Sequence, residues 1–136
     1  MVTRKLVPVL VTFAAVILLL DAGWAVCARL FGWYHGHGIF FLSLATYLTA
    51  GFVAYDCGGR ILSAVAGAVV SIVDNSLGTL ITWLILPTPV AQRLPSIPEM
   101  APMFAESVLV ALVLGFVGGL VAAMRHHWQE RRRLPT

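Results

Sequence analysis

Residues 61–86, ILSAVAGAVVSIVDNSLGTLITWLIL, form a long apolar stretch whose single charged residue is Asp74. A helix of this length measures about 39 Å, which exceeds the ~30 Å hydrocarbon core of a bilayer. The stretch is therefore long enough to cross a membrane. It must either tilt or be interrupted, and the polar run Asp74-Asn75-Ser76, with Gly78 just after it, marks the place for an interruption.

Three further apolar stretches surround this one, at about residues 6–28, 38–55 and 102–124. The chain of 136 residues is 60% hydrophobic and 11% charged. Soluble domains average about 45–50% apolar residues and about 25% charged residues. This composition excludes a soluble enzyme and a disordered chain, and two cysteines are too few for a disulfide scaffold. The sequence predicts an all-α integral membrane protein of one domain, residues 1–136, built as a bundle of four transmembrane helices.

Short joints separate the predicted spans. Residues 56–60, DCGGR, are expected to form a tight turn because glycine allows the backbone to reverse. Residues 87–101 are predicted to be a proline-rich outer loop, since proline cannot continue a helix. Residues 125–136 are predicted to be a basic cytoplasmic tail.

The distribution of lysine and arginine predicts the orientation. Seven of these residues are predicted to lie on one side of the membrane, and only Arg29 and Arg93 are predicted to lie on the other side. Positive residues stay in the cytoplasm, so the sequence predicts a multi-pass protein of the cell (inner) membrane with both termini cytoplasmic. Residues 4–28 also resemble a secretory signal peptide. A retained first helix is the expectation, because the residues that follow are again membrane spans.

Small residues recur every four positions in the predicted spans, and residues four apart share one helix face. The candidate packing residues are Ser63, Gly67 and Ser71 in the third span, with Ala111, Gly115 and Gly119 in the fourth. Small side chains let helices approach closely in lipid. These faces are expected to pack within the bundle or to form a seam with a second protein, and the spacing does not choose between them.

Acidic residues inside the spans are the strongest functional signal. Asp74 lies near the centre of its span beside Asn75, and an ionised carboxylate there costs at least ~2.5–3.5 kcal/mol. Further candidates for a proton or cation site are Asp21, Tyr47 and Glu106. No lysine or arginine lies in a span core. The acids are therefore expected to be protonated, to bind a cation, or to meet a basic side chain of another subunit. A purely structural, hydrogen-bonded Asp74 is the alternative.

Glu106 has a second interpretation. It follows Pro102 closely, and proline is common at the first position of a helix. Glu106 is therefore expected to lie in the first turn, where the helix dipole stabilises a negative charge.

Motifs for catalysis or metal binding do not occur in the sequence. His35 and His37 offer two imidazoles, but zinc sites use at least three protein ligands, so no metal and no cofactor are expected. Cys27 and Cys57 are predicted at opposite membrane faces, too far apart for a disulfide. No residue is assigned as catalytic, and enzyme activity has no positive support.

Basic residues gather after the last predicted span, where anionic lipid attracts them by about 1 kcal/mol per charge. The lipid-anchoring candidates are Arg125, Arg131, Arg132 and Arg133. A bilayer containing anionic lipid explains this cluster better than a nucleic acid, so no nucleic-acid partner is expected.

Two functions fit these features. The first is a non-catalytic subunit or scaffold of a membrane assembly, which would dock through its small-residue faces. The alternative is a small transporter or channel coupled to protons or cations, with Asp74 as the ion site. Because four short helices rarely enclose a pore, this alternative implies a homo-oligomer, and the first implies a membrane protein partner.

Overall fold

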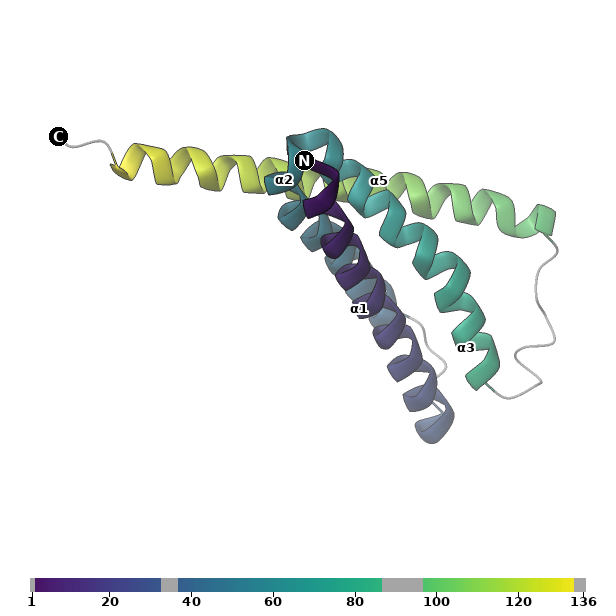
Figure 1. Cartoon of the computed structure of the whole chain (residues 1–136). Helices are drawn as coiled ribbons and strands as arrows, with labels where there is room; N and C mark the ends of the chain where they lie inside the picture. Colours follow the sequence, from purple (N-terminus) through teal and green to yellow (C-terminus); the bar gives the residue numbers. More distant parts are fainter. Residues whose placement is uncertain (1, 33–36, 87–96, 134–136) are drawn as a thin grey trace.

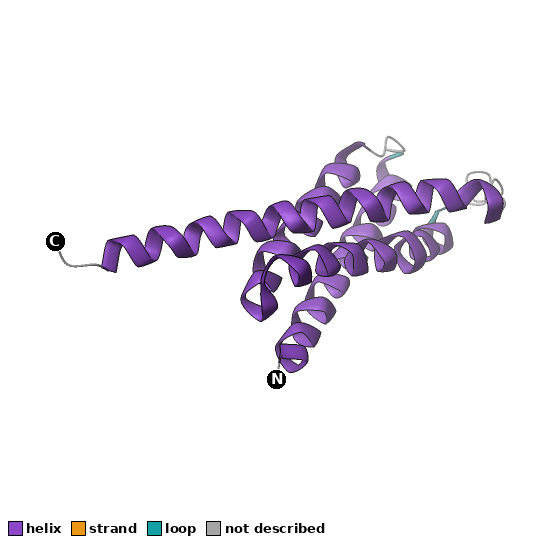
Figure 2. Cartoon of the chain, turned by 90° about the horizontal axis from the view of Figure 1, so that it is seen from above, coloured by secondary structure: helices purple, strands orange, loops and turns teal. Residues whose placement is uncertain are grey.

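Helices make up almost all of the structure, a computed structural model that describes residues 2–32, 37–86 and 97–133. Within these ranges there is no strand (Figure 2). Three helices are long and apolar enough to cross a membrane, Lys5–Phe31, Ile39–Ile85 and Met100–Arg132. The prediction of an all-α, multi-pass membrane protein is confirmed at this level.

Helix α1, Val2–Phe31, is buried along one face only. The buried face carries Leu6, Ile17, Asp21, Ala25 and Ala28, and the last four of these are spaced three or four residues apart. The remaining surface is apolar and exposed, as at Leu19, which is 73% exposed. A bilayer solvates such a surface, so the outer faces of α1 suit contact with lipid.

Helix α2, His37–Val73, contains a break at Gly58 and Gly59, where the chain reverses (Figure 1). Gly59 has φ +77, a left-handed conformation that side chains rarely adopt, so a glycine is required there. The contacts establish the reversal independently, because Gly51 before the break and Gly67 after it both lie against Gly115. The predicted spans 38–55 and 61–86 fall on the two sides of this break. We call the part of α2 before the break its first arm and the part after the break, which ends at Val73, its second arm.

The helix type changes after the second arm, in the region where the sequence predicts an interruption. Asp74–Gly78 form a π-helical turn, η1, and Thr79–Ile85 continue as helix α3. Asn75 and Ser76 bond to backbone carbonyls one turn earlier, those of Ser71 and Ile72. Polar side chains of this kind compete with the backbone for hydrogen bonds and accommodate a widened turn.

Helix α5, Ile97–Arg133, begins earlier and ends later than predicted. The predicted loop 87–101 is therefore helical from Ile97, and residues 87–96 lie outside the described part. Glu106 does not lie in the first turn, so its assignment to a helix-dipole role was wrong. Helix initiation is compatible with Pro98 near the start of the helix, which sequence reasoning had placed in the loop.

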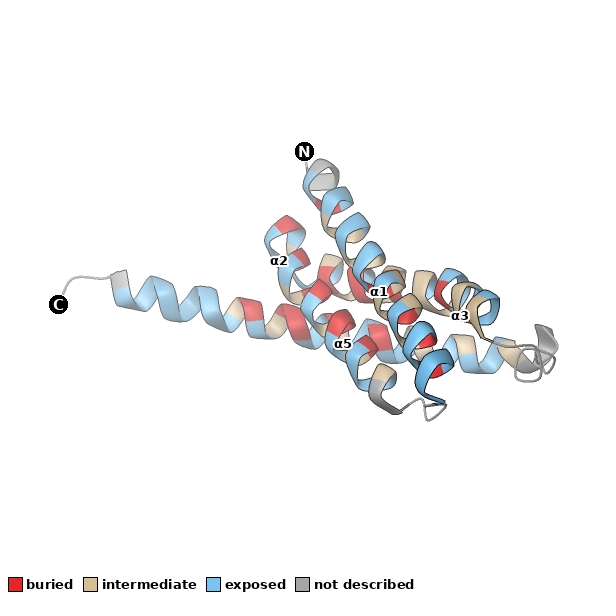
Figure 3. Ribbon diagram, turned by 90° about the horizontal axis from the view of Figure 1, so that it is seen from below, coloured by how far each residue is buried: buried red, intermediate tan, exposed pale blue. Residues whose placement is uncertain are grey.

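The helices are arranged with α2 in the middle. Its largest interface is with α5, while α1 packs on α2, η1 and α3. One apolar cluster joins Ile17 of α1 to Tyr47, Val70 and Ala111, and another joins Leu6 to both arms near the break. The last turns of α5 are exposed and extend beyond the other helices (Figure 3).

Glycines bring the backbones of α2 and α5 into direct contact. A Cβ atom added at Gly115 would lie 3.2 Å from Cα of Gly67 and still closer to the carbonyl oxygen of Ser63. One added at Gly118 would lie 2.8 Å from the amide nitrogen of Phe52. All six candidate packing residues are buried and lie on the facing sides of α2 and α5. Close approach of this kind is the main source of helix association in lipid.

Replacing Gly115 by alanine is expected to lower the free energy of unfolding by about 1–3 kcal/mol, because the new methyl group overlaps Ser63 and Gly67. The measurement is thermal unfolding of the detergent-purified protein followed by circular dichroism. Gly23→Ala is the matched control, since nothing lies within 4 Å of its Cβ position. An unchanged unfolding temperature for Gly115→Ala would contradict the close contact.

Candidate functional site

Two carboxyl groups from different helices meet over a glycine. Asp21 of α1 is only 6% exposed, and its carboxyl group lies beside Gly78, next to the place that the carboxyl group of Asp74 in η1 occupies. A Cβ atom at Gly78 would lie 2.9 Å from Cγ of Asp21 and 3.2 Å from Oδ1 of Asp74, and would overlap Oδ2 of Asp21. The absence of a side chain at Gly78 is therefore what allows the two carboxyl groups to approach.

The two carboxyl groups of this pair differ in the hydrogen bonds that they receive. The hydroxyl group of Tyr47, a residue that is 3% exposed, donates to Oδ2 of Asp74. By contrast, Oδ2 of Asp21 is buried and receives no hydrogen bond from any donor in the described ranges. Two ionised carboxylates held this close would repel each other. A proton or a cation between them removes the repulsion, so the arrangement suits binding of either.

A second polar network lies on the other side of η1. The side-chain amide of Asn75 donates to Oγ of Ser107 on α5 at 2.8 Å and to the carbonyl oxygen of Ser71 at 2.8 Å. The hydroxyl oxygens of Ser71 and Ser107 lie 3.1 Å apart. The π turn thus directs two consecutive residues to different neighbours, Asp74 to α1 and the first arm and Asn75 to α5.

A cavity of about 420 Å³ opens beside these two networks, between the first arm, η1 and α5. Its polar lining includes Tyr47, Asp74, Asn75, Glu106 and Ser107. Glu106 reaches the cavity from α5 and is itself exposed. No group of three or more His, Cys, Asp or Glu side chains suited to a metal ion occurs in the described part of the chain. Glu106 therefore lines the same cavity as Asp74 without joining the carboxyl pair.

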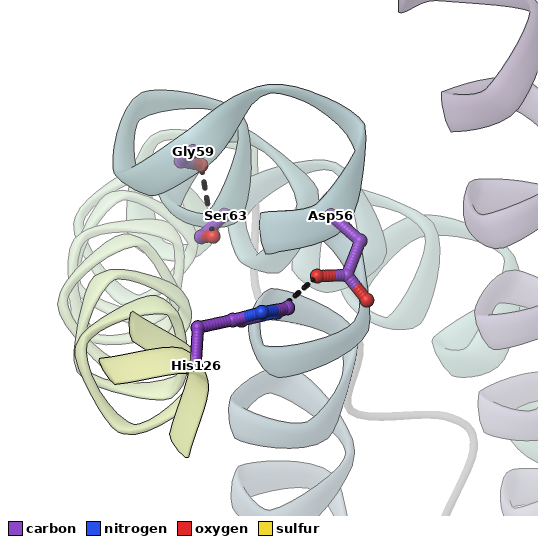
Figure 4. Close-up of polar contacts among 4 residues, drawn as sticks. All are labelled: Asp56, Gly59, Ser63 and His126. Carbon is purple, nitrogen blue, oxygen red and sulfur yellow. Dashed lines mark hydrogen bonds and ion pairs between the residues drawn. The ribbon is translucent and has the colours of Figure 1, made fainter. Parts of the chain in front are cut away.

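A polar contact at the break of α2 was not anticipated. Nε2 of His126 lies 2.7 Å from Oδ1 of Asp56 (Figure 4), and the imidazole ring lies 5.7 Å from the ring of Tyr55. Nearby, Ser63 donates to the carbonyl oxygen of Gly59 at 3.0 Å. Asp56 and His126 are 70 positions apart, so no local pattern could have paired them.

The basic segment of α5 is exposed at every described position that was predicted to contact lipid. Arg131 and Arg132 are exposed, and Nε of Arg131 donates to Nε2 of His127 at 3.0 Å. Arg125 is exposed as well, and its guanidinium group lies over the ring of Phe52, 5.8 Å from its centroid. The side chain of Arg133 and those of His35 and His37 lie outside the described residues.

Four of the five predicted ion-site residues come together, since Asp21, Tyr47 and Asp74 form one contact group and Asn75 adjoins it. The fifth, Glu106, lies across the cavity. The sequence pointed to Gly78 only as part of a helix interruption, and it assigned Ser107 no part in the polar site. The only signals for their roles were a glycine two positions after three polar residues and a serine beside Glu106. Comparison with protein-family models, with curated proteins and with solved structures gives no match.

Replacing Asp21 by asparagine is expected to leave the free energy of unfolding unchanged or to raise it by up to about 2 kcal/mol. The substitution removes a like charge from Asp74 and supplies an amide donor to it. The measurement is thermal unfolding in detergent.

The control for this substitution is Asp56→Asn at the exposed contact with His126. It is expected to change the free energy of unfolding by less than about 1 kcal/mol. A loss of more than about 2 kcal/mol for Asp21→Asn would show that the carboxyl pair holds the fold together.

Proposed function

We propose that the chain crosses the membrane four times, with both termini in the cytoplasm. The element Ile39–Ile85 has 47 residues, and a straight helix of that length would measure about 70 Å, more than twice the hydrocarbon core. The reversal at Gly58 and Gly59 gives each arm its own crossing. The excess of lysine and arginine on the side of the termini and of Arg60 supports this orientation.

We further propose that the protein transfers protons or small cations across the membrane as a homo-oligomer, with Asp21 and Asp74 as the ion site. The observation that carries this proposal is that two carboxyl groups, the buried one of Asp21 and the half-buried one of Asp74, lie together at Gly78, and that Asp21 has an oxygen without a donor in the described ranges. An acid pair of this kind is costly in a bilayer. A proton shared between Asp21 and Asp74, or a cation bound there, offsets the cost and can be exchanged.

The surrounding residues divide the remaining roles. Tyr47 holds Asp74 from the first arm by its hydroxyl group, and Asn75 fixes the π turn to Ser107 of α5. The cavity lets water and ions reach Asp74 from one side. Four short helices rarely enclose a pore unaided, so assembly of several copies would provide the rest of the pathway.

A subunit or scaffold role remains the second proposal. It was favoured by small-residue faces that could dock a partner. In the structure these faces contact each other, with Gly67 and Gly115 in direct apposition. The remaining support is the carboxyl pair itself, which could receive a basic side chain from another protein. A purified protein that transfers ions alone would favour transport, because a scaffold has no activity of its own.

Proteoliposomes containing the wild-type protein are expected to dissipate a pH gradient, read by an enclosed pH-sensitive dye. Asp74→Asn and Asp21→Asn should each slow the flux by at least about tenfold, because intramembrane acids of this kind serve as proton relays. The control is Asp56→Asn, which removes an acid at the break of α2 and should leave the flux unchanged. Wild-type vesicles that behave like protein-free vesicles would refute the transport proposal.

The orientation predicts which positions react with a membrane-impermeant maleimide in intact cells. In a variant with both cysteines replaced by serine, Leu30→Cys should be labelled from outside, since Leu30 is 71% exposed and adjoins Arg29. Gln129→Cys should react only after the membrane is permeabilised. Labelling of Gln129→Cys in intact cells would show that the C-terminus is outside.

A further inference from the structure

We infer that the cavity between the first arm and α5 binds a small organic cation with an apolar body, such as a substituted ammonium ion. The inference rests on the proposed function, because Asp74 belongs both to the proposed ion site and to the cavity wall. It goes further by assigning the class of molecule that the protein carries.

The charge of the cavity favours a cation. Asp74 and Glu106 line it from η1 and α5, and none of the residues that line it is basic. Glu106 forms no ion pair with any residue in the described ranges. Two carboxyl groups facing one space without a counter-charge attract a positive ligand, most strongly where the surroundings exclude water.

The remaining lining fits an apolar body rather than a bare metal ion. Leu44, Met103 and Val110 form apolar wall, and Phe40 contributes an aromatic ring. Hard cations such as Ca²⁺ and Mg²⁺ take a shell of oxygen ligands, whereas ammonium ions with hydrocarbon substituents bind well beside aromatic faces and aliphatic groups. A volume of about 420 Å³ also lies within the range of sites for small organic molecules.

Asp21 supplies the means of coupling to protons. It lies behind Asp74 and has an exposed fraction of only 6%. One of its oxygens has no donor in the described ranges. When an organic cation pairs with Asp74, the proton shared by the two carboxyl groups is released, and the charge of the site stays the same. The groups that face Asp74 are Asp21 from α1 and Tyr47 from α2, with Glu106 across the cavity on α5.

The test is a calorimetric titration of the detergent-purified protein with benzyltrimethylammonium, a permanent cation with an apolar ring. The wild type should bind it, and tetramethylammonium, which lacks the ring, should bind at least about threefold more weakly. Repeating the titration in two buffers of different ionisation enthalpy should show about one proton released per cation bound.

Substitutions locate the site. Asp74→Asn should weaken binding by at least about tenfold and Glu106→Gln by about threefold or more, because each removes a carboxylate from the cavity. Glu130→Gln is the matched control for Glu106→Gln, since Glu130 lies on the same helix in the exposed C-terminal part and should leave affinity unchanged. Circular dichroism and gel filtration check folding, and Glu106→Gln, at an exposed position, keeps the test decisive if Asp74→Asn does not fold.

The outcomes separate the two proposals. A wild type that does not bind benzyltrimethylammonium, or binding that Asp74→Asn and Glu106→Gln leave unchanged, overturns the cation site, while proton flux in vesicles would still support the ion pathway. Binding at the cavity without any flux in proteoliposomes, whether benzyltrimethylammonium is present or absent, would support the cation site and refute transport. Binding that is weakened by both substitutions, together with flux, supports both.

Discussion

The structure depends on direct backbone contact between α2 and α5. In lipid there is no hydrophobic force to drive two helices together, so their association relies on how closely they approach. Gly115 touches both arms of α2, at Gly51 and at Gly67, and the other glycines of α5 continue the contact. This contact fixes the two arms relative to each other, and it thereby fixes Tyr47 on the first arm relative to Asp74 at the end of the second.

The polar site is held by this packing rather than contributing to it. An acidic residue near the middle of a membrane costs about 2.5–3.5 kcal/mol, whereas a hydrogen bond between membrane helices returns about 0.6 kcal/mol on average. The bonds from Tyr47 to Asp74 and from Asn75 to Ser107 therefore do not offset the cost of placing two carboxyl groups, those of Asp21 and Asp74, inside the membrane. Residues that destabilise a fold and are nevertheless positioned by it are typical of functional sites, and this balance favours an exchangeable ion over a structural role.

The structure also changes the meaning of several sequence features. The small-residue faces, which fitted docking of a partner equally well, are occupied by α2 and α5 themselves. Glu106 lies well inside α5 because the helix begins at Ile97, so its charge faces a cavity and not a helix terminus. His126 contacts Asp56 at the break of α2 and so ties the start of the basic segment to the bundle, where sequence alone indicated only lipid contact.

The sequence by itself determined the all-helical membrane class, the reversal at Gly58 and Gly59, and the identity of the acids, because hydropathy, glycine and buried charge act locally along the chain. Only the tertiary structure decided that Asp21 meets Asp74, that Gly78 makes room for them, and that Glu106 shares the cavity. Asp21 and Asp74 lie on different helices, and their distance depends on how far α1 and the second arm are rotated about their axes. That rotation is set by the summed packing of many small side chains, which no single stretch of sequence encodes.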